Sequence, residues 1–228
     1  MTDTKKRFPL LILSAVLFFL IICPLVTIFV RAVITDGRLD FGSAWQTLTE
    51  SKNAEMILNS LLLGAAVTVL STIIAAPLAY LFTRTSFAKY RFFDIIFMIP
   101  FMTPPYIASM GWILFMQKRG LLQQLLPFTA GCEKIFFTFG GLTLVMSLHV
   151  FPFMLTILKN AMLNIPSSLE EAGAVFGAGF GRRLRKIFLP LLSGNYAIGA
   201  LLVFVKTIAE YGTPATLGKR IGFNVFTT

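Results

Sequence analysis

The sequence has few charged residues, and this scarcity excludes an ordinary soluble domain. Of its 228 residues, 13% are charged and 56% are hydrophobic, whereas a typical soluble domain carries about 25% charged residues. A water-soluble fold could not bury so much apolar surface, so the composition predicts an integral membrane protein. The net charge of +10 comes from short basic clusters between apolar runs. That arrangement is typical of membrane topology and disfavours nucleic acid as a partner.

Metal-ligating and catalytic residue types are also scarce. The two cysteines, Cys23 in an apolar run and Cys132 in a loop, form no CxxC motif, and histidine occurs once. The sequence therefore predicts neither a disulfide framework nor a metal site. No H-E-x-x-H motif or nucleophile elbow accompanies the single His149, so we expect no catalytic set and no enzyme. Nothing resembles a Walker A sequence, so we expect no nucleotide cofactor in this chain.

What the chain does have is long uncharged runs. A helix needs about 20 residues to cross a hydrocarbon core about 30 Å thick, and each run has 19 or more. We therefore predict five transmembrane helices. The first run is too long for a signal peptide and is predicted to be a retained span. The runs are Phe8–Val30, Met56–Thr83, Ile95–Gln117, Ile135–Leu158 and Ile187–Val205.

The distribution of Lys and Arg predicts the orientation. With a cytoplasmic N-terminus, the cytoplasmic segments hold 11 of these residues and the outer loops hold 6, and an excess of Lys and Arg marks the cytoplasmic side. The segment between the fourth and fifth runs is then cytoplasmic. Five spans that begin inside leave the C-terminus outside, so we expect the sequence to be the front part of a longer chain.

That cytoplasmic segment, SSLEEAGAVFGAGFGRRLRKIFLP, differs from the rest of the chain. Ser167 with Glu170, and Ser168 with Glu171, fit the capping-box pattern S-x-x-E after Pro166. Closely spaced glycines follow, and they oppose one continuous helix while favouring a short helix, a turn and a second short helix. A basic stretch at 182–186 then precedes the fifth run, where it can contact membrane lipid. The glycines are Gly173, Gly177, Gly179 and Gly181.

The same segment carries a resemblance. It resembles the "EAA" loop of membrane subunits of binding-protein-dependent ABC importers, whose pattern is E-A-A-x3-G-x9-I-x-L-P. Every spacing agrees, and one small residue replaces another where Gly173 stands in place of Ala. The resemblance implies an all-α integral membrane protein, a polytopic helical bundle of the type I importer permease kind. The matching residues are Glu171, Ala172, Gly173, Gly177, Ile187, Leu189 and Pro190.

The resemblance also implies partners and roles. Residues 1–228 would be one permease domain, and the segment 160–186, here named the coupling loop, would dock into a cytoplasmic dimer of ATP-binding subunits that hold ATP and Mg²⁺. Glu171 would contact that ATPase, and Gly177 would form the turn. A periplasmic solute-binding protein and a second permease half, fused or separate, would complete a transporter of the bacterial inner membrane.

Two groups of residues are candidates for the substrate pathway. Pro104 and Pro105 in the third run, with Pro100 nearby, predict a kink that either shapes packing or lines the pathway. Ionisable groups at membrane depth are costly and usually face a bundle interior or a polar cavity. His149 is a packing residue or a pathway residue on this argument. Lys206 and Glu210 are spaced i, i+4 and can pair, either at the outer interface or in the pathway.

The last residues of the sequence bear on the substrate. The tail EYGTPATLG…FNVFTT resembles a segment of the ferric-iron branch of this family, and related branches carry polyamines, thiosulfate or phosphonates. The alternative function is a secondary transporter driven by an ion gradient. Such a protein needs carboxylates near the middle of the bilayer, and the sequence offers only Asp94 and Glu210 near the ends of spans.

Overall fold

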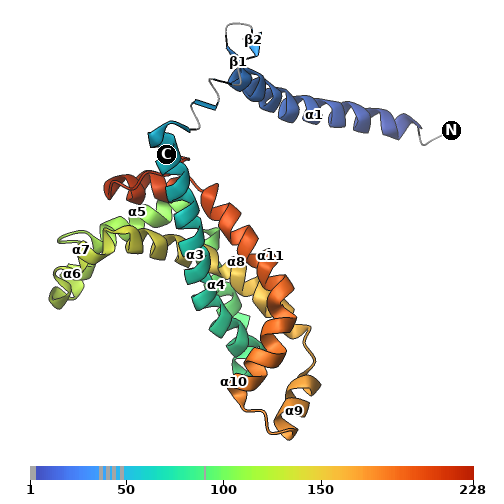
Figure 1. Ribbon diagram of the computed structural model, residues 1–228, viewed down its shortest axis with the longest axis vertical. Helices are drawn as coiled ribbons and strands as arrows, with labels where there is room; N and C mark the ends of the chain where they lie inside the picture. Colours follow the sequence, from blue (N-terminus) through green and yellow to red (C-terminus); the bar gives the residue numbers. More distant parts are fainter. Residues whose placement is uncertain (1–3, 36–37, 40–41, 43–44, 47–48, 90) are drawn as a thin grey trace. The chain divides into compact units, whose positions relative to one another are not determined.

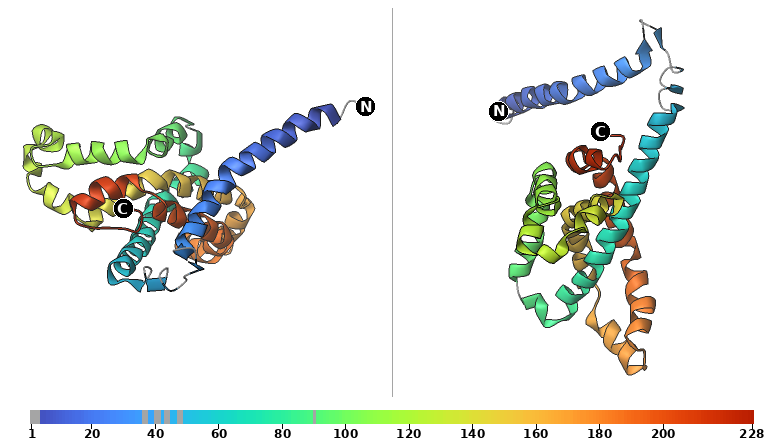
Figure 2. Two further views of the ribbon diagram at one scale, coloured as in Figure 1. Left: turned by 90° about the horizontal axis from the view of Figure 1, so that it is seen from above. Right: turned by 90° about the vertical axis from the view of Figure 1, so that its left-hand side faces the viewer.

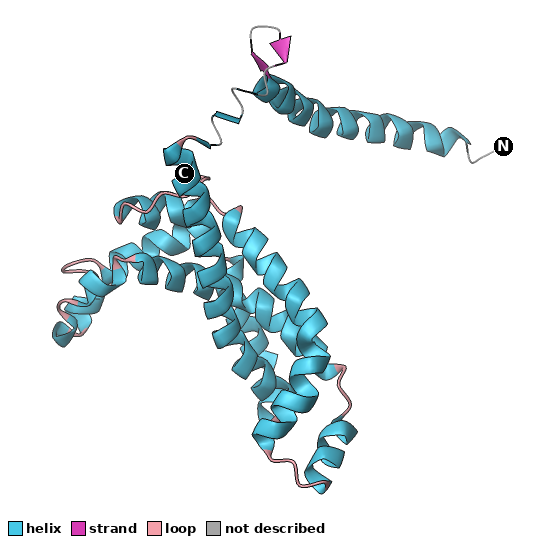
Figure 3. Cartoon of the chain, viewed as in Figure 1, coloured by secondary structure: helices cyan, strands magenta, loops and turns pink. Residues whose placement is uncertain are grey.

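The computed structural model describes residues 4–35, 38–39, 42, 45–46, 49–89 and 91–228, and these form two compact units, 1–55 and 56–228. The first unit consists mainly of helix α1 (Thr4–Val33). A short antiparallel pair of two-residue strands, β1 (Ile34–Thr35) and β2 (Arg38–Leu39), follows with Ile34 opposite Leu39. Nearly all of the described chain is helical, which confirms the predicted all-α membrane class (Figure 3).

Four of the five predicted spans are confirmed as helices long and apolar enough to cross a membrane. They lie in α1, in α3 (Ser51–Arg84), in α8 (Phe139–Leu163) and in a continuous helical stretch, 180–208. That stretch joins α10 (Phe180–Arg183), the π-helical turn η3 (Leu184–Phe188) and α11 (Leu189–Ile208). The helix that contains the fifth predicted span therefore begins at Phe180, before the apolar run itself.

The third predicted span is a bent pair of helices and not one continuous helix. Helices α4 (Arg91–Met102) and α5 (Pro105–Met116) meet at an angle of 94°. Pro104 and Pro105 have no backbone N–H to donate, and each disfavours helical geometry in the residue before it. Pro104 is accordingly extended, with ψ 130°, and Pro105 begins α5. The described residues contain five candidate spans only if this pair counts as one.

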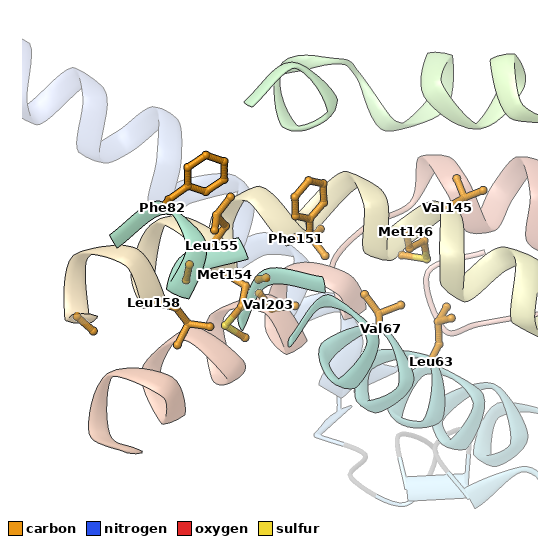
Figure 4. Packing of buried hydrophobic residues seen from close by; sticks show 14 of the residues in the cluster. Leu63, Val67, Phe82, Val145, Met146, Phe151, Met154, Leu155, Leu158 and Val203 are labelled. Atoms are coloured by element: carbon orange, nitrogen blue, oxygen red, sulfur yellow. The ribbon is translucent and has the colours of Figure 1, made fainter. Parts of the chain in front are cut away.

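Helix α8 forms the centre of the second unit. It packs against α4 and α11, and its Ser147 hydroxyl donates to the Val67 carbonyl of α3 at 3.4 Å. Figure 4 shows side chains of α8 gathered with side chains of α3 and with Val203 of α11. Small residues let the helices approach closely, as is common in membrane bundles. Gly64 of α3 lies against the Phe204 ring, and Gly199 of α11 lies against the Met154 sulfur. The largest buried residues of this core include Leu63, Val67, Leu142, Met146, Met154, Phe188 and Val203.

Short helical turns connect these helices. Among the described residues these are η1 (Ser86–Lys89), α6 (Leu121–Leu125), η2 (Pro127–Thr129), α7 (Cys132–Phe136) and α9 (Ser167–Val175), and η4 (Pro214–Gly218) follows α11. The chain after η4 returns to the beginning of α3. There the Asn59 side chain donates to the Asn224 carbonyl at 3.0 Å, and the Phe226 N–H donates to Ser60 Oγ at 2.9 Å.

Gly141, at the junction of α7 and α8, is expected to tolerate no side chain. A Cβ there would lie 1.8 Å from the Phe136 carbonyl oxygen, whereas at Gly140 the nearest such atom is 3.5 Å away. We expect Gly141→Ala to destabilise the protein by about 1–3 kcal/mol through overpacking. Gly140→Ala is the control and is expected to unfold at the parent temperature or above it. Equal unfolding temperatures for the two detergent-purified variants would contradict this close approach.

Candidate functional site

The first half of the coupling loop is helix α9, which begins without the predicted capping boxes. Its N-cap is Pro166, and no side chain caps the helix. Both predicted boxes are therefore wrong, because Ser167 and Ser168 already lie inside the first turn and their hydroxyls are not at the N-cap position. Glu170 in that first turn still lies where the helix dipole favours a negative charge.

Helix α9 ends in a glycine turn, as the sequence predicts. Gly177 has φ +74°, a left-handed conformation that L-residues with a Cβ seldom adopt. The Ala178 N–H donates to the Gly173 carbonyl at 2.9 Å, and the Gly177 N–H donates to the Ala174 carbonyl at 2.9 Å. These two bonds form a Schellman motif. The turn fixes the direction in which the chain leaves α9 toward α10, which confirms the predicted helix–turn–helix.

The two ends of the E-A-A…I-x-L-P pattern touch each other in the structure. A Cβ on Gly173 would lie 3.1 Å from the terminal methyl of Ile187 and 3.3 Å from Cγ of Arg183. Glycine at this position therefore lets α9 pack closely on η3. Leu189 and Pro190 lie just beyond, at the exposed beginning of α11, while Phe188 between them and Ile187 is buried.

Aromatic side chains at the base of the coupling loop pack against Tyr80 of α3. The Tyr80 ring lies 5.4 Å from the Phe180 ring of α10 and 5.9 Å from the Phe188 ring, both edge to face. Such pairs are worth about 0.5–1.5 kcal/mol beyond their buried area. The loop is therefore packed against the helix bundle at its base.

The outward surface of α9 is open. Glu171 and Ala172 are exposed, and Val175 and Phe176 at the tip of the loop are 84% and 87% exposed. Figures 1 and 2 show α9 at the end of the bundle that is farthest from the C-terminus. Exposed aromatic side chains are enriched in protein-binding surfaces.

The sequence analysis missed two residues of this site, Arg84 and Glu170. Arg84 ends α3, and its Nε lies 2.5 Å from Oε1 of Glu170. Arg84 is one of the 11 basic residues counted on the cytoplasmic side, and Glu170 was expected only to cap a helix. A basic residue at the end of a span was the one available signal, because helix C-termini favour cations.

The proline pair and His149 lie at the bend between α4 and α5. Pro104 is exposed and Pro105 half-buried. A cavity of about 310 Å³ is lined there by Pro100, His149 and their neighbours. His149 is 6% exposed, its ring stacks on Phe101 at 6.2 Å, and its Nδ1 has no hydrogen-bond partner in the structure. The structure thus places His149 against the bend, with one polar nitrogen unsatisfied.

Lys206 and Glu210 do not form the predicted pair. Among the residues that the structure describes, no ion pair joins them. Helix α11 ends at Ile208, so Glu210 lies beyond the helix on which an i, i+4 pair depends. The Lys206 ammonium instead lies 4.9 Å from the centre of the Phe101 ring.

Glu210 fixes the chain that follows α11. Its Oε1 accepts a hydrogen bond from the Thr213 N–H at 2.9 Å, and its carbonyl accepts one from the Thr227 hydroxyl. Burial raises the pKa of the Glu210 carboxyl, and the hydrogen bonds from Thr213 oppose that shift. The tail containing Glu210 packs on α5, where Ser109 and Thr216 are hydrogen-bonded at 2.6 Å.

The described part of the chain contains no cluster of three or more His, Cys, Asp or Glu side chains that could hold a metal ion. Cys23 and Cys132 are free thiols. The residues with a distinctive arrangement are therefore those of the coupling loop and of the bend, and neither group forms a nucleophile–base constellation of the kind that catalysis requires.

Comparison with known proteins gives concordant matches. The chain is 27% identical over 221 residues to "Putative ferric transport system permease protein FbpB 1" of Haemophilus influenzae, covering 96% of this chain and 35% of the relative. The corresponding figures for "Ferric transport system permease protein FbpB" of Actinobacillus pleuropneumoniae are 27%, 96% and 32%. "Probable sulfate transport system permease protein cysT" of Chlorokybus atmophyticus is 25% identical, covering 97% of this chain and 76% of the relative.

The chain thus spans about a third of the length of the two ferric relatives. Residues 67–228 match the family described as "Binding-protein-dependent transport system inner membrane component". That match extends from the middle of α3 through the coupling loop to Thr228, and it includes every residue of the E-A-A…I-x-L-P pattern. The chain therefore belongs to the family of binding-protein-dependent transport system inner membrane components.

Proposed function

We propose that the chain is a permease subunit of an ATP-driven solute importer, in which it forms part of the translocation pathway. The observation that carries this proposal is the exposed surface of α9. Glu171 and Ala172 face outward at one end of the bundle, while Gly173 packs on Ile187 behind them. A helix fixed on one side and open on the other is suited to docking into a groove on a second protein.

The family of the chain supports the partners that we propose. A separate pair of cytoplasmic subunits would bind ATP and Mg²⁺ and receive the coupling loop, and a solute-binding protein would dock on the opposite side of the membrane. Because the matched ferric relatives are about three times as long, a second permease half completes the pathway in this proposal, either fused or separate. The N-terminus would be cytoplasmic, in the inner membrane of a bacterium.

The alternative of ion-gradient transport is less well supported. Coupling to an ion gradient requires carboxylates that can change their charge within the membrane. Asp94 pairs with Lys159 at 2.6 Å, and Glu210 lies beyond the end of α11. Neither carboxylate occupies the middle of a span in the described part of the chain.

Ferric iron is the substrate that we propose, because the tail resembles the ferric branch and two matched relatives carry ferric in their names. The match to a protein named for sulfate transport keeps oxyanions as the leading alternative. Polyamines, thiosulfate and phosphonates remain further alternatives from the sequence pattern.

We expect vesicles that contain the complete permease, its ATPase and its binding protein to accumulate ⁵⁵Fe(III) only when ATP is supplied. Radiolabelled sulfate offered in parallel tests the leading alternative. An ATPase unable to hydrolyse ATP is the control and should remove the accumulation. ATP-dependent sulfate uptake without iron uptake would reject the substrate while keeping the transporter class. Uptake that follows an imposed ion gradient and ignores ATP would reject the class.

A further inference from the structure

Arg84 makes contacts with three separate segments at one end of the bundle. Its Nη2 donates to the Ile165 carbonyl at 2.7 Å and to the Met162 carbonyl at 3.2 Å. Its Nε pairs with Glu170 on α9, and its guanidinium carbon lies 5.6 Å from the centre of the Phe188 ring. One side chain at the end of α3 thus holds the end of α8, the coupling helix α9 and the base of α11.

The arginine side chain is suited to this position in a way that lysine is not. The planar guanidinium can donate to carbonyl and carboxylate oxygens in different directions at once and can also stack on an aromatic ring. Met162 lies in the last turn of α8, and Ile165 lies just beyond the helix, whose C-cap is Asn164. Arg84 donates to both carbonyls, of which the Met162 carbonyl also accepts the Ile165 N–H at 3.1 Å, and it adds a positive charge where the helix dipole favours one.

The Arg84–Glu170 pair is shielded from solvent, which gives it more weight than a surface ion pair. The side chains of Arg84 and Glu170 are 14% and 15% exposed. Removing one partner of a shielded pair leaves the other charge without compensation, which is far more damaging than the loss of an exposed pair. The neighbouring Glu171 is exposed and has no ion pair or hydrogen bond among the described residues.

We propose that Arg84 is a positioning residue that clamps the coupling helix to α3 and α8. The two adjacent glutamates then have separate roles, with Glu170 held inward by Arg84 and Glu171 directed outward. When α9 is displaced, Arg84 transmits the movement to α3 and α8. Without Arg84, α9 would rotate about its glycine turn and leave both helices in place. The role of Arg84 in transmission rests on the proposed function, whereas the contacts that form the clamp lie entirely within this chain.

The clamp is tested by the mobility of a spin label at the tip of the loop. The label is attached to Val175→Cys in the complete permease, with Cys23 and Cys132 replaced by serine, in lipid nanodiscs. We expect Arg84→Ala and Glu170→Ala each to increase the label's mobility. We expect the double variant to match Arg84→Ala, because that single variant already removes the ion pair with Glu170. Glu171→Ala is the matched control and should leave the mobility at the parent value.

Two results would overturn the clamp. One is an unchanged mobility of the label in Arg84→Ala, and the other is a mobility in the double variant that equals the full sum of the two single effects. Glu170→Gln, which keeps the shape of the side chain, replaces Glu170→Ala if the latter fails to fold. The aromatic contacts of Tyr80 with Phe180 and Phe188 remain in every variant.

The transmission role has its own readout in the assembled complex. We expect Arg84→Ala to keep its ATPase bound while the stimulation of ATP hydrolysis by loaded binding protein falls roughly tenfold, within the usual range of coupling between sites. Undiminished stimulation overturns the role of Arg84 in transmission. Failure of the parent protein to bind any ATPase contradicts the proposed function instead, and leaves the label result to decide the clamp.

Discussion

Replacing Glu171 with lysine is expected to abolish ATP-dependent uptake while the protein still inserts into the membrane in normal amounts. Glu171 is exposed on α9 and has no partner among the described residues, so the substitution removes no internal contact. Surface substitutions of this kind usually change stability by less than about 0.5 kcal/mol. A reversed charge at the docking surface places like charges together, which costs several kcal/mol at an interface.

Two further variants show whether the loss of uptake is due to the reversed charge at Glu171 or to any charge reversal on the surface of the protein. Glu171→Gln removes the charge without reversing it and should retain part of the uptake. Glu50→Lys reverses another exposed glutamate, outside the coupling loop, and should transport at the parent rate. Normal ATP-dependent uptake by Glu171→Lys, at matched protein levels, would remove Glu171 from the docking role.

Gly177→Val is expected to uncouple ATP hydrolysis from the loaded binding protein by straining the backbone of the turn. At φ +74° a valine is strained, and a left-handed L-residue costs about 1–2 kcal/mol or more when β-branched. No atom lies within 4 Å of a Cβ built on Gly177, so steric clash is not the cause. The strain breaks the Schellman motif and turns α9 away from its docked direction, and we expect the stimulation of ATP hydrolysis by loaded binding protein to be lost.

The choice of replacement residue tests this explanation. Asparagine tolerates the left-handed region better than other residues, so Gly177→Asn should retain more stimulation than Gly177→Val. Gly179 has an ordinary φ of −62° and equally open space, which makes Gly179→Ala a control with little expected effect. Unchanged stimulation in Gly177→Val, or equal losses for valine and asparagine, would show that the left-handed turn is not needed.

The sequence predicts the features of this fold that depend on local chemistry. Apolar runs of sufficient length correspond to helices, Pro104 and Pro105 interrupt the third run, and Gly177 adopts the left-handed turn that its position between two short helices requires. In each case the determining residues are neighbours in the chain. The angle of 94° between α4 and α5 depends on tertiary packing as well, and the sequence therefore indicated only a kink.

Features that depend on distant residues or on element ends were not predictable. Arg84 and Glu170 meet only because α3 and α9 converge in the folded bundle, and no spacing in the sequence links them. The predicted pairing of Lys206 with Glu210 failed because α11 ends between them, at Ile208. A difference of one or two residues in the end of a helix is enough to undo an i, i+4 argument.

The docking of the coupling loop is tested most directly by photo-crosslinking from its tip. A photoreactive phenylalanine analogue at Phe176, which is 87% exposed, is introduced into the complete permease in native membranes, and the crosslinked protein is identified by mass spectrometry. We expect a crosslink to a protein that carries Walker A and B sequences, and loss of that crosslink in Glu171→Lys. Efficient labelling of lipid or other proteins alone, with no ATPase in repeated preparations, would contradict it.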